Sequence, residues 1–238
     1  QYAQQVAGSY INTRAPFSTY ATAWVTSLSV RVTALDNGHL MVGEEEYVMV
    51  EPWVWQKTDG SIRIAAQVED GKVVRIGATA RSFIPQTPAQ QALLPVLVGS
   101  SLALLVVIVT WPIGALRRRW AIRDGRRAAD PLPRAGRLAR IGAALAIGAV
   151  AGWLTLMLTP MFTQDFRALP TPGGVRPVQV LQWLGVAAII PAILDLFGAV
   201  KGRAGWRRIV MASLLLLGLI GMAWWAWSGN ALSWDISI

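Results

Sequence analysis

The sequence contains no cysteine and a single histidine, His39. A disulfide, a thiolate nucleophile and a thiolate metal site are therefore excluded. A Ser-His-Asp triad could use only His39, and no serine or carboxylate can be tied to this residue by sequence. Three acids close to it in sequence, Glu44, Glu45 and Glu46, are best interpreted as an exposed turn between strands. We expect no metal site and no cofactor.

Acidic residues are also scarce, with 13 Asp and Glu against 22 Lys and Arg and a formal net charge of +9. The excess is unevenly distributed. Residues 1–92 hold seven bases and eight acids, whereas segments 117–140 and 201–208 together hold 13 bases and two acids. Both basic segments flank apolar runs, so membrane topology and anionic lipid headgroups explain their charge. We expect no nucleic-acid partner.

Long apolar runs dominate the sequence from about residue 93 onward. The expected membrane spans are residues 93–116, 141–161, 178–200 and 209–227, each close to the ~20 residues that cross a bilayer as a helix. The lipid bilayer is therefore an expected partner, and helices are expected because lipid cannot bond to exposed backbone groups. The basic segments predict cytoplasmic loops. The N-terminal domain and the C-terminus are then expected on the periplasmic or extracytoplasmic side of a bacterial inner membrane.

Tryptophans and small residues support this interpretation. Trp111 and Trp206 near the cytoplasmic ends of the spans, and Trp183, Trp225 and others near the outer ends, predict an aromatic belt. A small-residue face in the second span contains the pair Gly148-x-x-x-Gly152, which permits close helix approach. That approach can occur inside one bundle or between copies, so a homo-oligomer stays possible.

The first part of the chain predicts a small β domain over residues 1–84, with residues 85–92 as a linker. Turn signals at 36–38, 59–60 and 70–71 separate short strand-like runs, and alternation is visible in SLSVRVTAL and SIRIAAQV. The runs are 27–35, 39–42, 47–50, 53–57, 61–68, 72–77 and 81–84. Residues 16–26 predict a loop or short helix. The expected fold is a small all-β barrel or sandwich followed by a four-helix transmembrane domain, 93–238.

Asp195 is the one ionisable residue inside an expected span. A carboxylate in hydrocarbon is costly and suggests function by default. However, it lies six residues before Lys201, and we expect it to face the bundle and pair with an arginine of the first basic segment. It is the one possible intramembrane polar site. A transport role, which Pro160 and Pro191 would also support, is the alternative.

The segment GSYINTRAPFSTYATAW at 8–24, the alternating strands and the end of the first span, PIGALRRRW, together resemble a known arrangement. It is similar to the C-terminal region of membrane-bound serine hydrolases of the β-lactamase and penicillin-binding-protein-like superfamily. Gly8, Tyr10, Thr13 and Arg14 match its G-x-Y-x-x-T-R strand, which opens a small β barrel after the catalytic domain. The resemblance implies a parent enzyme that uses an acyl-serine mechanism on peptides, esters or amides outside the cytoplasm.

The catalytic signatures of that superfamily are absent from this chain. No serine has a lysine three residues later, as S-x-x-K requires. Tyr10-Ile11-Asn12 has the form of Y-x-N and is interpreted as part of a strand. Lys57-Thr58-Asp59-Gly60 resembles K-T-G with an extra Asp and is interpreted as a hairpin turn. We expect no catalytic residue here.

Three hypotheses for function follow. The first is a non-catalytic accessory and membrane-anchoring module of a serine hydrolase whose catalytic domain lies upstream. The chain begins at Gln1 without an initiator Met or a signal peptide, and we expect a longer precursor, with a removed signal peptide as the alternative. The second is a self-standing membrane protein that senses or binds a partner through the β domain. The third is a small transporter.

Overall fold

The computed structural model divides into two units, Gln1–Leu94 with Ser228–Ile238 and Pro95–Trp227. The structure describes residues 2–14, 22, 29–78, 81–125, 132–163 and 171–233, and side chains of 132–163 only as far as 159. The loop or short helix expected at 16–26 lies outside the described residues except for Thr22. So do Trp234 and the side chain of Pro160.

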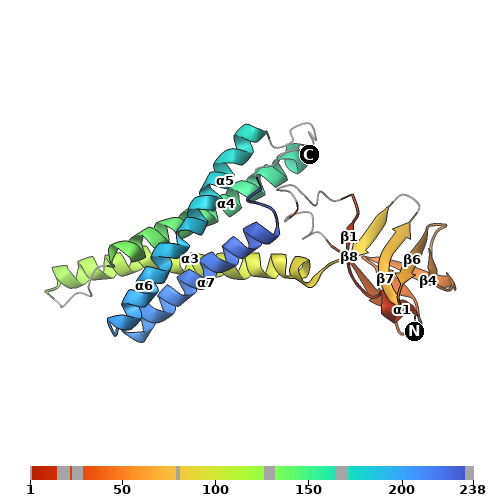
Figure 1. Ribbon diagram of the computed structural model, residues 1–238, viewed down its shortest axis with the longest axis horizontal. Helices are drawn as coiled ribbons and strands as arrows, with labels where there is room; N and C mark the ends of the chain where they lie inside the picture. The colour runs from red at the N-terminus through yellow and green to blue at the C-terminus, as the bar shows by residue number, and fades with distance from the viewer. Residues whose placement is uncertain are drawn as a thin grey trace. The chain divides into compact units, whose positions relative to one another are not determined.

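The first unit contains a closed antiparallel barrel in which each strand pairs with the next and β8 pairs with β1 (Figure 1). Closure leaves no free strand edge within the barrel. Each predicted run overlaps one of the strands β2 to β8, and the predicted β domain followed by apolar helices is confirmed. The strands are β1 (Gly8–Asn12), β2 (Val30–Ala34), β3 (Leu40–Val42), β4 (Glu45–Glu51), β5 (Val54–Lys57), β6 (Arg63–Glu69), β7 (Lys72–Ala78) and β8 (Ser82–Pro85).

The three predicted turns join neighbouring strands. Gly38 has φ 82° in the β2–β3 turn, where the Asn37 side chain accepts a hydrogen bond from the His39 amide. Asp70 and Gly71 form the two-residue turn between β6 and β7, both with positive φ (50° and 74°). Two positive φ values match the right-handed twist of a hairpin, which explains why Asp-Gly occurs here.

Trp53 falls within the expected run 53–57 but lies outside the strand, since β5 begins at Val54. It lies in the turn between β4 and β5 with φ 66°, after Pro52. Its ring meets Tyr2 edge to face, with 4.8 Å between centroids. Trp55, on β5, is fully buried in the barrel core. Both tryptophans contribute to one hydrophobic cluster, but the turn rather than strand periodicity directs Trp53.

Side chains from all around the barrel fill its interior. The buried cluster includes Val32, Leu40, Tyr47, Trp55, Ile64 and Ile76. The short helix α1 (Tyr2–Val6) adds Ala3 and Val6 to it. Tyr10, on β1, donates a 2.7 Å hydrogen bond to the Val6 carbonyl and so ties α1 to the barrel. Burial raises the pKa of Tyr10 to about 12.

The second unit is built from helices α3 (Pro88–Arg123), α4 (Arg134–Thr163), α5 (Pro172–Ala187), α6 (Ile189–Lys201) and α7 (Trp206–Ser228). Helices α5 and α6 are interrupted only at Ala188, so together they correspond to the third expected span. In the described part of the chain, four helical stretches are long and apolar enough to cross a membrane: 88–123, 134–159, 172–201 and 206–228.

Most of the expected linker, 85–92, is helical. Only Gln86 and Thr87 separate β8 from α3, whose first residue is Pro88. The Thr87 hydroxyl accepts from the Gln90 amide, and the Gln90 side chain accepts from the Thr87 amide (3.3 and 2.9 Å). This reciprocal pair is a capping box, and proline fits the first helical position because its missing N–H needs no partner there.

Glycines let the helices of this unit approach closely. A Cβ on Gly142 would clash with the Ala188 side chain, and one on Gly152 would lie 2.8 Å from Val178. Gly148, the other half of the noted glycine pair, has open space around it. Thus Gly142 and Gly152 pack α4 against its neighbours inside the chain.

The tryptophans of the helical unit differ widely in exposure. Trp206 and Trp227 are 71% and 75% exposed, as expected of residues at a membrane interface. Trp153 and Trp225 are fully buried. Trp225, which the sequence placed in the outer belt, therefore belongs to the interior of the helical unit, where its large ring fills space between helices.

Candidate functional site

Asp195 lies on α6 with 1% of its surface exposed and forms the centre of a buried ionic cluster. Its Oδ1 accepts from Nη2 of Arg208 at 2.8 Å, and its Oδ2 accepts from Nη1 of Arg140 at 3.3 Å. Arg140 is the partner type that the sequence predicted, an arginine of the first basic segment. Arg208, from the second basic segment, is an additional partner that sequence reasoning missed.

Gly136 makes room for this cluster. A Cβ at Gly136 would lie 2.5 Å from Oδ1 of Asp195, so the carboxylate sits directly against the α4 backbone. The Gly136 carbonyl also accepts a 2.7 Å hydrogen bond from Nη1 of Arg140, one turn later on the same helix. A glycine four residues before a buried arginine is the local signal that could have indicated this close approach.

The cluster joins three helices by charge. Arg140 comes from α4, Asp195 from α6 and Arg208 from α7. The Arg140 and Asp195 side chains are 7% and 1% exposed, whereas that of Arg208 is 31% exposed. A buried carboxylate between two guanidinium groups is well compensated, and removing it would leave positive charge without a counter-ion. The two arginines and one acid leave an excess of positive charge at this end of the unit.

A second polar group lies on α5. Gln179 and Gln182 are 1% and 0% exposed, and Arg176 donates a 3.0 Å hydrogen bond to the Gln179 side chain. Both polar atoms of the Gln182 amide lack a hydrogen-bond partner among the described residues. Since these residues lie about four to five helical turns before Asp195, they form a separate polar group from the ionic cluster.

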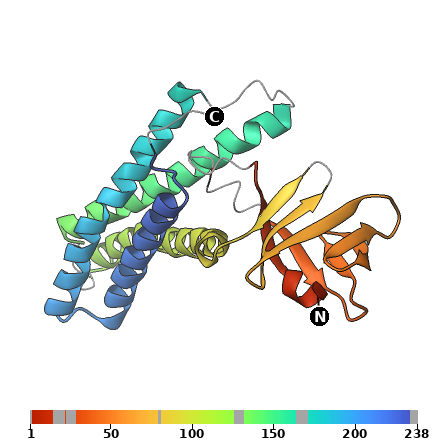
Figure 2. The ribbon, with the colours of Figure 1, turned by 45° about the vertical axis from the view of Figure 1, so that its right-hand side comes forward.

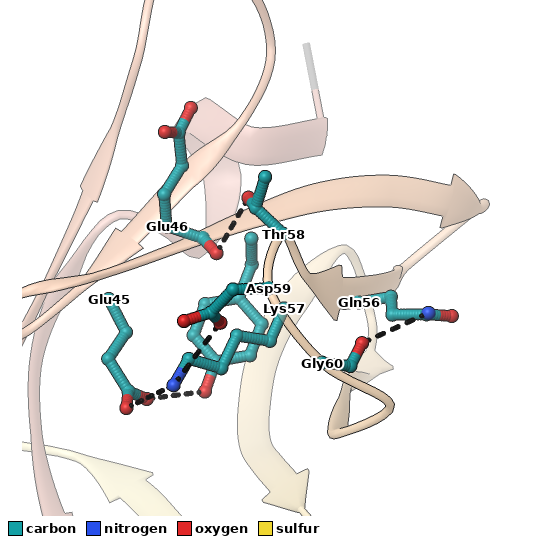
Figure 3. A network of polar contacts seen from close by, with 8 residues as sticks. Glu45, Glu46, Gln56, Lys57, Thr58, Asp59 and Gly60 are labelled. Carbon is teal, nitrogen blue, oxygen red and sulfur yellow. Dashed lines mark hydrogen bonds and ion pairs between the residues drawn. The ribbon is translucent and has the colours of Figure 1, made fainter.

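Polar contacts on the barrel gather around Lys57 (Figure 3). Its amine lies 2.8 Å from Oε1 of Glu45 and 3.3 Å from Oδ1 of Asp59. Tyr47 donates to the other oxygen of Glu45 at 3.0 Å. The hydrogen bonds from Lys57 and Tyr47 lower the pKa of Glu45, and those to Glu45 and Asp59 raise the pKa of Lys57. Each group is thereby held in its charged form.

The segment Lys57-Thr58-Asp59-Gly60 is the predicted hairpin turn. Within the turn, the Gly60 amide donates to the Lys57 carbonyl at 3.3 Å. The Thr58 hydroxyl donates to the Glu46 carbonyl at 3.0 Å (Figure 3), and the Thr58 amide donates to the same carbonyl, also at 3.0 Å. These bonds fasten the β5–β6 turn to β4. The charged and polar contacts around Lys57 therefore stabilise this hairpin turn.

His39 pairs with Glu46, with 2.7 Å between Nδ1 and Oε1. Glu45 and Glu46 belong to β4, so only Glu44 of the three lies in the expected turn. Within the described residues no group of three His, Cys, Asp or Glu side chains could hold a metal ion. The His39–Glu46 contact is thus a cross-strand pair next to the β2–β3 turn.

The residues that carry the family resemblance have structural positions in the barrel. Gly8 and Tyr10 lie on β1, and Thr13 follows it. The Thr13 hydroxyl and amide both donate to the Ser82 carbonyl, at 3.1 and 2.9 Å. Tyr10 anchors α1, as described above, and the Arg14 amide donates to the Asn12 side chain. Among these contacts, the two Thr13 bonds link the first strand of the barrel to the last.

Comparison of the chain with protein-family models, with curated proteins and with solved structures finds no match. The function must therefore be argued from the two units themselves.

Proposed function

We propose that the chain is a membrane-anchoring accessory module that holds a small β barrel at the outer face of a bacterial inner membrane. The observation that carries this proposal is the pairing of a side-chain-filled barrel with four helices of membrane-spanning length. The positive-inside rule supports the orientation, because the basic segments 117–140 and 201–208 then face the cytoplasm.

The enzyme that this module would serve is a serine hydrolase of the β-lactamase-like superfamily, located upstream in the same precursor. The support is the resemblance at Gly8, Tyr10, Thr13 and Arg14, together with the use of Tyr10 to tie α1 to the barrel and of Thr13 to link β1 to β8. The barrel would position the catalytic domain near the membrane surface. The helices would restrict its search for membrane-near substrates to two dimensions.

The ionic cluster supports an anchoring function. Three helices are joined through the contacts of Asp195 with Arg208 at 2.8 Å and with Arg140 at 3.3 Å, which suits a rigid support.

A self-standing sensor that binds a partner through its barrel is the second candidate. The transporter alternative has Asp195 as its main support, and that carboxylate is occupied by two arginines.

The test is active-site labelling of the protein as its gene encodes it. A fluorophosphonate probe and a fluorescent penicillin are applied to intact membranes, and the labelled polypeptide is identified by mass spectrometry. We expect one labelled serine in the same polypeptide, upstream of Gln1. A polypeptide that begins at Gln1 after signal-peptide removal and takes up neither probe would refute the hydrolase proposal and favour the sensor.

A further inference from the structure

The helical unit contains a cavity of about 520 Å³ between α3, α4 and α7. Figures 1 and 2 show that the end of α3, the beginning of α4 and the turn between α6 and α7 gather at one end of this unit. The cavity lies there, and five of its lining residues are arginines: Arg118, Arg137, Arg140, Arg207 and Arg208. No acidic side chain lines it among the described residues.

One of these arginines, Arg140, is buried. Arg140 is 5% exposed, and both of its hydrogen bonds within the described part of the chain use Nη1. Its Nε and Nη2 groups donate neither of these bonds, and Arg140 lines the cavity. Arg208 contributes a second partly buried guanidinium, whereas Arg137 and Arg207 are exposed at the rim.

The positive charge of the cavity lining favours binding of an anion. Five guanidinium groups surround it, and Asp195 is the only carboxylate that pairs with any of them in the described structure. Helices α4 and α7 begin at this end and helices α3 and α6 end there, so the partial charges of the helix termini offset one another and the arginines supply the positive charge. Guanidinium groups bind phosphate oxygens in a bidentate geometry, so phosphate is the anion that this arrangement fits best.

We propose that this cavity binds the phosphate-bearing headgroup of an anionic phospholipid. The rest of the lining favours a lipid over a free phosphate: Trp111, Leu132 and Met211 present apolar surface beside the arginines. Basic pockets between transmembrane helices on the cytoplasmic side are typical sites for such headgroups. The proposal is independent of the hydrolase, since every residue in it belongs to the helical unit.

The test measures lipid retention by native mass spectrometry on the full chain in neutral detergent. Short-chain phosphatidylglycerol, short-chain phosphatidylcholine and inorganic phosphate are titrated separately. The double variant Arg118→Gln/Arg137→Gln removes two cavity arginines outside the ionic cluster. Arg117→Gln/Arg134→Gln is the matched control, since it removes the same charge from the same two helices at residues that do not line the cavity.

We expect phosphatidylglycerol to bind at least tenfold more tightly than phosphatidylcholine. We expect the cavity variant to lose about 25-fold in affinity, as the product of two arginine contacts worth about fivefold each, and the control to lose less than threefold. Equal binding of both lipids would overturn the proposal even if the variants failed to fold. Equal losses in both variants would indicate diffuse charge without a site. Phosphate binding as tight as phosphatidylglycerol would replace the lipid with a soluble phosphate compound.

Discussion

Asp195→Asn is the most informative perturbation of the helical unit. It removes one negative charge from between Arg140 and Arg208 and leaves the number of side-chain heavy atoms unchanged. Asp195 is 1% exposed and contacts both guanidinium groups. Removing one partner of a buried ion pair costs about 3–5 kcal/mol because the remaining charge stays buried. An arginine at the centre of a membrane helix carries a comparable insertion penalty of about 2.5–3.5 kcal/mol.

The assay is equilibrium unfolding of the chain in detergent micelles, followed by tryptophan fluorescence. We expect Asp195→Asn to lower the free energy of unfolding by about 3–5 kcal/mol. Arg140→Gln should cost more than Arg208→Gln, since their side chains are 7% and 31% exposed and solvent screens the second. Combining Asp195→Asn with Arg140→Gln should recover part of the loss, because one unpaired charge is removed.

Two results would refute this reasoning. A loss below about 1 kcal/mol for Asp195→Asn would equal that of a surface ion pair and would mean that water reaches the carboxylate. Unchanged folding and membrane insertion with loss of activity of the whole protein would instead make Asp195 a functional group rather than a structural one.

Three further predictions concern single positions. Gly136→Ala should destabilise the helical unit by about 1–3 kcal/mol because its Cβ would overlap the Asp195 carboxylate, whereas Gly99→Ala, in open space, should be neutral or stabilising in the same assay. The barrel should lose stability as pH rises from 10 through about 12, because the Tyr10 hydroxyl is held protonated above its ordinary pKa in the fold only; circular dichroism should show that loss reduced in Tyr10→Phe. Thr87→Ala should cost about 1 kcal/mol by removing the α3 cap, and Thr87→Ser should restore it in thermal unfolding.

The turns and the spans could be predicted because their signals are local. Asp70-Gly71 requires positive φ at both residues, and few residue pairs other than Asn-Gly and Asp-Gly supply it. The apolar runs are long enough for bilayer thickness to limit the alternatives. The partner of Asp195 could be predicted as an arginine by elimination, since an unpaired carboxylate in this position is costly.

The features that could not be predicted depend on three-dimensional geometry that the spacing of residues along the sequence does not determine. Arg208 lies 13 residues after Asp195, on the far side of a turn, and only the α6–α7 geometry brings the two together. The expected run 53–57 includes Trp53 because it alternates with Trp55. In the structure Trp53 follows Pro52 in the turn before β5. The start of α3 at Pro88, inside the expected linker, depends on the capping bonds between Thr87 and Gln90, which polar composition does not indicate.

The central claim is that the barrel and the basic ends of the helices lie on opposite sides of a membrane, and cysteine accessibility tests it most directly. The chain has no native cysteine, so single cysteines at Ser61 and Thr171, and separately at Asp124 and Gly205, can be introduced into the protein as its gene encodes it. A membrane-impermeant maleimide should label the first two in intact cells and the last two only after permeabilisation. Labelling of Gly205→Cys in intact cells, or protection of Ser61→Cys, would contradict the proposed topology.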